Sequence, residues 1–198
     1  VCEALRAGKT VCGEKPLCMR EEQLDEIVKI INDTGNARLM VGFNRRFAPF
    51  AAETRKLTGP LVMRYRVSVQ PLPVSHWLND PVSGGGRILG ELCHFVNYLI
   101  FAANACPARL FATGFGADNV QVNLRFVDGS VAAIDYFSVA DAALEKEHFE
   151  AFGGGRHLVV TDFRDKGQSE EVRQFVRAVK AGGLMPVGLE EIVRSKRA

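Results

Sequence analysis

Residues 119–138, NVQVNLRFVDGSVAAIDYFS, contain the pattern that decides the fold class of this chain. Polar and apolar side chains alternate on both sides of Asp128-Gly129, a dipeptide typical of the tight turn in a β-hairpin. The stretches 108–116 and 145–163 have the same strand character, and a glycine-rich turn at 153–155 divides the second. Consecutive strands without an intervening helix predict antiparallel pairing.

Helical patterns lie on either side of this strand region. Residues 61–70 alternate strictly between the two faces and predict a strand with one face exposed to solvent. A loop rich in Pro, Gly, Asn and Asp then leads to an apolar helix over residues 86–102. An amphipathic helix is expected at 168–183, and another begins after residue 186. The predicted fold class is therefore α+β, a large mostly antiparallel sheet with helices packed on one face.

The first 43 residues have a different organisation, which alternates helix, strand, helix and strand. Residues 20–35 are the clearest helix, because their apolar positions follow the helical period and Gly35 ends the pattern. The run 37–43, ARLMVGF, is typical of a buried strand. This alternation predicts the end of a doubly wound parallel sheet whose first half would lie upstream of residue 1.

Composition and charge exclude some classes of function. The 198 residues are 47 % hydrophobic and 24 % charged, with a formal net charge of +2. This balance argues against a nucleic-acid partner, and no apolar run approaches the roughly 20 residues of a membrane span. The five cysteines are odd in number and form no C-x-x-C pair, so we expect buried thiols and a cytoplasmic location.

Three motifs occur in order along the chain: AGKTVCGEKPL at 7–17, LMVGFNRRFAP at 39–49 and GGGRILGELCHFVN at 84–97. Together they resemble the glucose–fructose oxidoreductase / inositol 2-dehydrogenase (Gfo/Idh/MocA) family. The resemblance implies an NAD- or NADP-dependent oxidoreductase acting on a sugar, cyclitol or sugar derivative. The glycine-rich string also resembles a branch in which this part follows a zinc-type alcohol dehydrogenase-like domain, so a fusion upstream is a further expectation.

The resemblance also implies a domain division. Residues 1–46 would be the residual C-terminal part of a dinucleotide-binding Rossmann domain, and 47–198 an α+β substrate-binding and oligomerisation domain. The pyrophosphate motif G-x-G-x-x-G, expected between a strand and a helix, does not occur in the 198 residues. We therefore expect this chain alone to bind the dinucleotide weakly, with the first ~80–90 residues of the Rossmann part lying upstream, as a half built of βαβ units suggests.

By the resemblance, the catalytic residues are Lys15 and His94. The Lys15 ammonium could stabilise charge developing on a substrate oxygen, and an imidazole with a pKa near 6.5 suits proton transfer. Many family members carry an Asp four residues before this His, where this chain has Gly90. Glu91 could supply the missing carboxylate to the imidazole, since both positions lie near residue 94 on a helix. The alternatives are lost chemistry at Gly90 and a satisfied core histidine at 94.

The other candidate binding residues lie after a predicted strand end, in the loop before the apolar helix, or on that helix. An arginine after a strand end suits a carboxylate or phosphate, although a solvated turn explains Arg45 and Arg46 equally well. Arg87 at a helix start could bind an anionic group, or be a solvated charge. The predicted cofactor-binding residues are Glu14, Lys15, Pro16, Asn44 and Arg45. The predicted substrate-binding residues are Trp77, Asn79, Arg87 and Asn97. No metal ligand set is identifiable.

Two functions follow from these observations. The first is the substrate-binding and catalytic part of an NAD(P)-dependent oxidoreductase, inactive as a fragment. The alternative is a non-catalytic assembly module of a family member that has lost the catalytic Asp. Apolar side chains on both faces of runs such as SVAAIDYF would suit a buried interface, so a homo-oligomer formed through the sheet face is expected in either case.

Overall fold

A computed structural model describes residues 1–80 and 82–197. The first elements are α1 (Cys2–Arg6), β1 (Val11–Gly13), α2 (Glu21–Thr34), β2 (Leu39–Val41), a 3-10 turn (Asn44–Phe47), α3 (Pro49–Thr54), β3 (Val62–Ser68) and a 3-10 turn (Trp77–Asn79). A π-helical turn (Ile88–Leu92) leads directly into α4 (Cys93–Ala103). The rest are β4 (Pro107–Phe115), β5 (Asn119–Phe126), β6 (Val131–Phe137), β7 (Glu147–Gly153), β8 (Arg156–Val160), α5 (Gln168–Ala181) and α6 (Leu189–Arg197).

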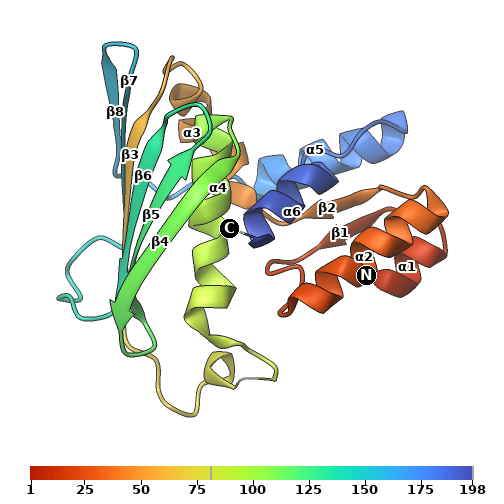
Figure 1. Cartoon of the computed structure of the whole chain (residues 1–198), viewed down its shortest axis with the longest axis horizontal. Helices are drawn as coiled ribbons and strands as arrows, with labels where there is room; N and C mark the ends of the chain where they lie inside the picture. Colours follow the sequence, from red (N-terminus) through yellow and green to blue (C-terminus); the bar gives the residue numbers. More distant parts are fainter. Residues whose placement is uncertain (81, 198) are drawn as a thin grey trace.

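The larger unit is a six-stranded sheet in the order β4-β5-β6-β3-β7-β8. Every neighbouring pair is antiparallel except β3 and β6, which run parallel. Helix α4 lies against one face of this sheet (Figure 1). Its apolar side chains meet those of the sheet in a core rich in aromatic rings, including Tyr65, Phe95, Tyr98, Tyr136 and Phe149. The predicted α+β fold class is confirmed.

The smaller unit is built on β1 and β2, which pair in parallel. Helix α2 begins where Gln23 accepts backbone hydrogen bonds from residues 19 and 20, and it ends at Gly35 in the left-handed conformation. The core of this unit also takes Met185, Val187 and Ile192 from the end of the chain. Accordingly, α5 and α6 lie beside β1 and β2 (Figure 1). The domain division at residue 46 stays a prediction.

The segment after Phe43 is a 3-10 turn that leads into the short α3. The helix expected at 86–102 is present, but its second turn is π-helical, a geometry that often marks functional sites. Among the described helices, none is long and apolar enough to cross a membrane.

Candidate functional site

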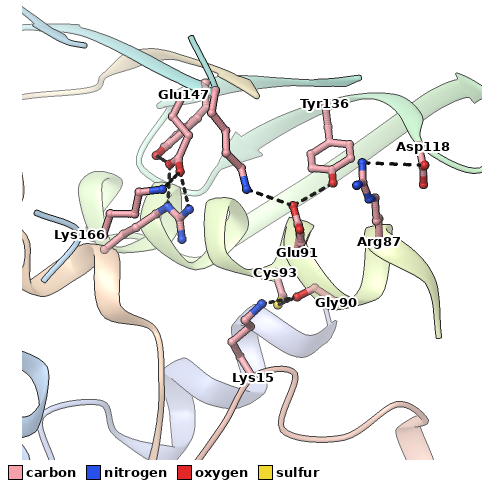
Figure 2. Close-up of polar contacts among 12 residues, drawn as sticks. Lys15, Arg87, Gly90, Glu91, Cys93, Asp118, Tyr136, Glu147 and Lys166 are labelled. Carbon is pink, nitrogen blue, oxygen red and sulfur yellow. Dashed lines mark hydrogen bonds and ion pairs between the residues drawn. The ribbon is translucent and has the colours of Figure 1, made fainter. Parts of the chain in front are cut away.

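Lys15 and the π turn form the centre of the candidate site. Strand β1 ends at Gly13, and two residues later the Lys15 ammonium donates a 2.6 Å hydrogen bond to the carbonyl oxygen of Gly90 (Figure 2). The peptide bond between Lys15 and Pro16 is cis. The contact joins residues 75 positions apart and brings the carboxyl end of the parallel strands to the helix that carries His94. The structure therefore brings together two of the three predicted catalytic positions.

His94 lies in an unusually cationic environment. Burial, reinforced by the positive charges of Arg45 and Lys15, lowers the pKa of His94 to about 2. Its Nδ1 atom is buried and has no hydrogen-bond partner among the described residues. The ring makes an edge contact with Phe43, with centroids 6.5 Å apart. The expectation of a pKa near 6.5 is therefore wrong, and the imidazole is neutral at physiological pH.

Glu91 does not support His94 in the way we expected. Its Oε2 atom accepts a 2.9 Å hydrogen bond from the Tyr136 hydroxyl and lies 4.0 Å from Lys146 Nζ. Figure 2 shows the Glu91 side chain directed at the sheet, whereas Lys15 approaches Gly90 from the opposite side of the helix. Burial and Glu91 both raise the pKa of the Tyr136 hydroxyl. The substitute-carboxylate role is corrected, because the π turn directs this side chain to Tyr136.

Arg45 belongs to a buried ionic cluster, which corrects both interpretations of its side chain. Its guanidinium donates two hydrogen bonds to Glu147, at 2.9 and 2.8 Å, and lies over the Phe95 ring. Lys166 Nζ and the Tyr65 hydroxyl each donate 2.7 Å hydrogen bonds to the same carboxylate. Burial raises the pKa of Glu147, but Arg45 and Lys166 outweigh it and lower this pKa to about 2. Arg45 therefore binds an internal carboxylate and is neither solvated nor open to a cofactor.

Three other selected side chains also have internal partners. Arg46 donates a pair of hydrogen bonds to Glu191 in α6. Asn44 donates to the carbonyl oxygen of Lys166, and Asn97 is buried with its amide donating to Ser195. These contacts hold α6 and the segment before α5 against the rest of the chain. The predicted cofactor role of Asn44 and substrate role of Asn97 are therefore corrected to positions in packing contacts.

Glu14 is exposed at the carboxyl edge of the parallel strands, a place that suits a cofactor. A Cβ atom built on Gly42 would lie only 3.3 Å from its Oε2 atom, so the carboxylate sits over the end of β2. Behind it, Glu171 of α5 is buried with Oε1 lacking a hydrogen-bond partner among the described residues. Burial and the charge of Glu14 raise the pKa of Glu171 to about 7.

The loop that precedes the π turn closes over it through Leu78. A Cβ atom on Gly90 would lie 3.1 Å from Leu78 Cδ1, and one on Gly84 would lie 2.4 Å from the Leu78 backbone. Leu78 therefore occupies the space beside position 90. Trp77 is 63 % exposed, and the Asn79 amide donates to the carbonyl oxygen of Pro73. Their substrate-binding roles stay predictions.

Arg87 is buried, which excludes a solvated charge. It is 5 % exposed, and its Nε and Nη1 atoms have no hydrogen-bond partner within the described chain. Its nearest ionic neighbour is Asp118, whose Oδ2 atom lies 4.0 Å from Nη1 (Figure 2). In residues 1–80 and 82–197, no three His, Cys, Asp or Glu side chains are grouped to hold a metal ion.

Sequence reasoning missed Glu147, Lys166, Tyr65 and Glu171. The available signal for Glu147 was weak: it is an acidic residue near the start of an expected strand, and a buried acidic residue needs a charged partner. Its partner Arg45 lies 102 positions away, and no local pattern connects the two.

Known proteins resemble this chain in sequence and in fold. No family model matches the chain. It is 47 % identical over 51 residues to an inositol 2-dehydrogenase from Rhizobium meliloti, covering 26 % of the chain and 15 % of that relative. It is 30 % identical over 147 residues to a 1,5-anhydro-D-fructose reductase from Ensifer adhaerens, covering 65 % of the chain and 43 % of that enzyme.

Solved structures share the fold across nearly the whole chain. An NAD binding oxidoreductase from Klebsiella pneumoniae superposes with a TM-score of 0.83 at 18 % identity, covering 99 % of this chain and 71 % of that one. The six-stranded sheet, the helix with the π turn and the parallel strand pair therefore have the fold of these oxidoreductase structures. The curated relatives and the structural neighbours support the Gfo/Idh/MocA family for this chain, which spans less than half the length of the two curated relatives.

Proposed function

We propose that this chain is the substrate-binding and catalytic part of a dehydrogenase that acts on a CH–OH or carbonyl carbon of a sugar, cyclitol or sugar derivative with NAD or NADP. The observation that carries the proposal is the meeting of Lys15 with the π turn, one helical turn before His94. The names of the curated relatives, an inositol dehydrogenase and an anhydrofructose reductase, support this substrate class.

The residues at the carboxyl edge of β1 and β2 fit a dinucleotide only in part. The Glu14 carboxylate over Gly42 can accept hydrogen bonds from ribose hydroxyls. Asn44 and Arg45 do not fit, because both are committed to internal partners. A nicotinamide, when bound, supplies the ability to accept or return a hydride.

Lys15 is the group that deals with the reacting oxygen. Its ammonium donates to a backbone carbonyl, a neutral acceptor that a substrate oxygen can replace. In the direction of carbonyl reduction, the ammonium stabilises the negative charge that develops on that oxygen as the carbon gains a hydride, and it then donates a proton to the oxygen. His94 is neutral and orients the hydroxyl through a hydrogen bond without taking its proton.

The test compares Lys15→Met with Lys9→Met in the full-length natural protein. Lys9 is exposed and provides a matched loss of one lysine. Turnover of myo-inositol and 1,5-anhydro-D-fructose is measured with both cofactors. We expect Lys15→Met to lower kcat by roughly 100-fold or more, the size of general acid–base effects, and Lys9→Met to leave it unchanged. Equal turnover in wild type and Lys15→Met would refute the proposal.

A second candidate function is assembly with another copy, and one observation favours it. On the sheet face opposite α4, the register aligns Val131, Val62 and Phe152 in one row across three strands. All three are exposed, at 41 %, 55 % and 45 %. We propose a homo-oligomer that buries this row. Light scattering should give more than the monomer mass, and Val62→Lys should return the monomer; a monomeric wild type at high micromolar concentration would refute it.

A further inference from the structure

A group of polar side chains lies between the π turn and the sheet, and the proposed reaction does not use it. Arg87 precedes the π turn, Asp118 lies between β4 and β5, and Glu91 and Tyr136 complete the group (Figure 2). Glu91 and Tyr136 satisfy each other, and Lys146 lies 4.0 Å from Glu91. Arg87 alone has two fully buried donors without a partner among the described residues.

A buried guanidinium with unmade hydrogen bonds is unfavourable for stability. Leaving a desolvated donor without an acceptor costs about 1–3 kcal/mol, and more for a charged group. Arg87 therefore does not stabilise the fold in this arrangement as Arg45 does. Stability that is sacrificed at one position commonly marks a binding role.

The distance to Asp118 indicates what fits between the two side chains. The 4.0 Å from Arg87 Nη1 to Asp118 Oδ2 is too long for a direct hydrogen bond. One oxygen atom about 2.8 Å from each would bridge them at an angle of roughly 90°. Such an oxygen must accept from the guanidinium and donate to the carboxylate, which a hydroxyl does and a carboxylate or phosphate oxygen does not.

The charges of the group also favour a neutral ligand. Arg87 and Lys146 bring two positive charges, and Glu91 and Asp118 bring two negative ones. An additional anion would face two carboxylates. This corrects the expectation that Arg87 binds an anionic substituent.

We propose that Arg87 and Asp118 form a hydroxyl-binding subsite for a polyol or sugar. The proposal rests on the proposed function for the choice of substrate class alone, because the Arg87 group lies on the sheet side of the helix, whereas Lys15 reaches Gly90 from the other side. One hydroxyl of the ligand bridges Arg87 and Asp118, and recovers hydrogen bonds that the free protein leaves unmade.

The first test measures binding to the full chain by calorimetry, with myo-inositol and D-glucose as neutral probes and D-glucuronate as an anionic one. We expect Arg87→Met and Asp118→Asn each to weaken binding of the neutral probes about tenfold, the effect of one hydrogen bond to a charged group. The exposed Arg156→Met is the matched control and should bind like wild type. D-glucuronate should bind no more tightly than D-glucose.

The second test is thermal unfolding of the same variants. A binding role predicts that Arg87→Met unfolds at or above the temperature of wild type, because an unpaired buried charge is removed. Three results would overturn the subsite: a large loss of stability in Arg87→Met with unchanged binding, tighter binding of D-glucuronate, or no binding of any neutral probe by wild type. A bridging water alone would leave both variants with wild-type affinity, which also contradicts it.

The subsite and the proposed function fail separately. If wild type shows no turnover but probe binding still depends on Arg87, the proposed reaction is refuted and the subsite stands. If turnover requires Lys15 and is unchanged in the Arg87 and Asp118 variants, the subsite is refuted and the proposed reaction stands.

Discussion

Two arginines, Arg45 and Arg87, are both buried beside the helix that carries His94, but their hydrogen-bonding surroundings differ. Arg45 donates two hydrogen bonds to the Glu147 carboxylate and lies over the Phe95 ring. Lys166 donates a hydrogen bond to the same carboxylate. Arg87 faces Asp118 across 4.0 Å and leaves two donors unmade within the described chain. Burial is therefore the same for both, but hydrogen bonding differs.

The difference separates a structural role from a binding role. The Arg45 cluster joins the turn after β2 to β7 and to the segment before α5. Burial is the main cause of the lowered pKa of His94, and the charge of Arg45 lowers this pKa further. The Arg87 group has no such completed set of partners, which leaves it able to gain from a ligand.

The largest effect is expected for Glu147→Gln. The Glu147 side chain is buried, at 2 % exposure, and accepts hydrogen bonds from Arg45, Lys166 and Tyr65. The amide therefore leaves the buried Arg45 and the partly exposed Lys166 without a counter-charge. Breaking one partner of a buried ion pair costs about 3–5 kcal/mol. For a chain of this size the melting temperature should fall by about 6–20 °C, measured by calorimetry. The exposed Glu145→Gln should melt like wild type; similar melting of both variants would show the cluster to be dispensable.

The free energy of unfolding should depend on pH through the protonation of the Glu147 carboxylate. Arg45 and Lys166 lower the pKa of Glu147 to about 2 in the folded chain, below its ordinary value near 4.5. The stabilisation is therefore complete above about pH 4.5 and is lost as pH falls through 2, amounting to about 3 kcal/mol. Urea unfolding from pH 7 to pH 2 should show this loss in wild type and a shallower one in Glu147→Gln. Parallel curves would contradict the assignment.

The sequence predicted the elements that rest on local periodicity. The alternating runs at 61–70 and 119–138 and the helices at 20–35 and 168–183 all form, because their side-chain period matches the face they bury. The hairpin turn at Asp128-Gly129 forms for the same local reason, with Gly129 at a positive φ.

The site was less predictable because its contacts are not local. Lys15 and His94 were selected through family resemblance, and the structure gives them a common environment. The Arg45–Glu147 pair spans 102 positions, and no periodicity places the two residues together. Glu91 was assigned from α-helical spacing, which fails in a π turn because the angle between successive side chains is smaller there. The errors therefore concern orientation more than residue choice.

Glu171→Gln extends the contrast to a buried carboxyl that lacks a counter-charge. Burial and Glu14 raise the pKa of Glu171 to about 7, so the folded chain holds this proton to a higher pH than the unfolded chain. The wild type is thus most stable below about pH 4.5 on this account, and loses that stability as pH rises through 7. At pH 8 the neutral amide should raise stability by about 1–2 kcal/mol, with no gain at pH 4. Urea unfolding at both pH values checks it, with Glu145→Gln as control; an equal change at both would contradict the raised pKa.

The smallest expected effect compares the same substitution on the two sides. Tyr65 donates to the fully buried Glu147, and Tyr136 donates to the partly exposed Glu91. Tyr65→Phe should cost about 2 kcal/mol, because a hydrogen bond to a buried charge is lost and water cannot replace it. Tyr136→Phe should cost about 1 kcal/mol or less, since Glu91 is hydrated and still faces Lys146. Urea unfolding of both variants at pH 7 measures the difference. Equal losses of stability in the two variants would mean that the Tyr136–Glu91 hydrogen bond is as strong as the Tyr65–Glu147 one. The contrast would then be limited to the unmade hydrogen bonds of Arg87.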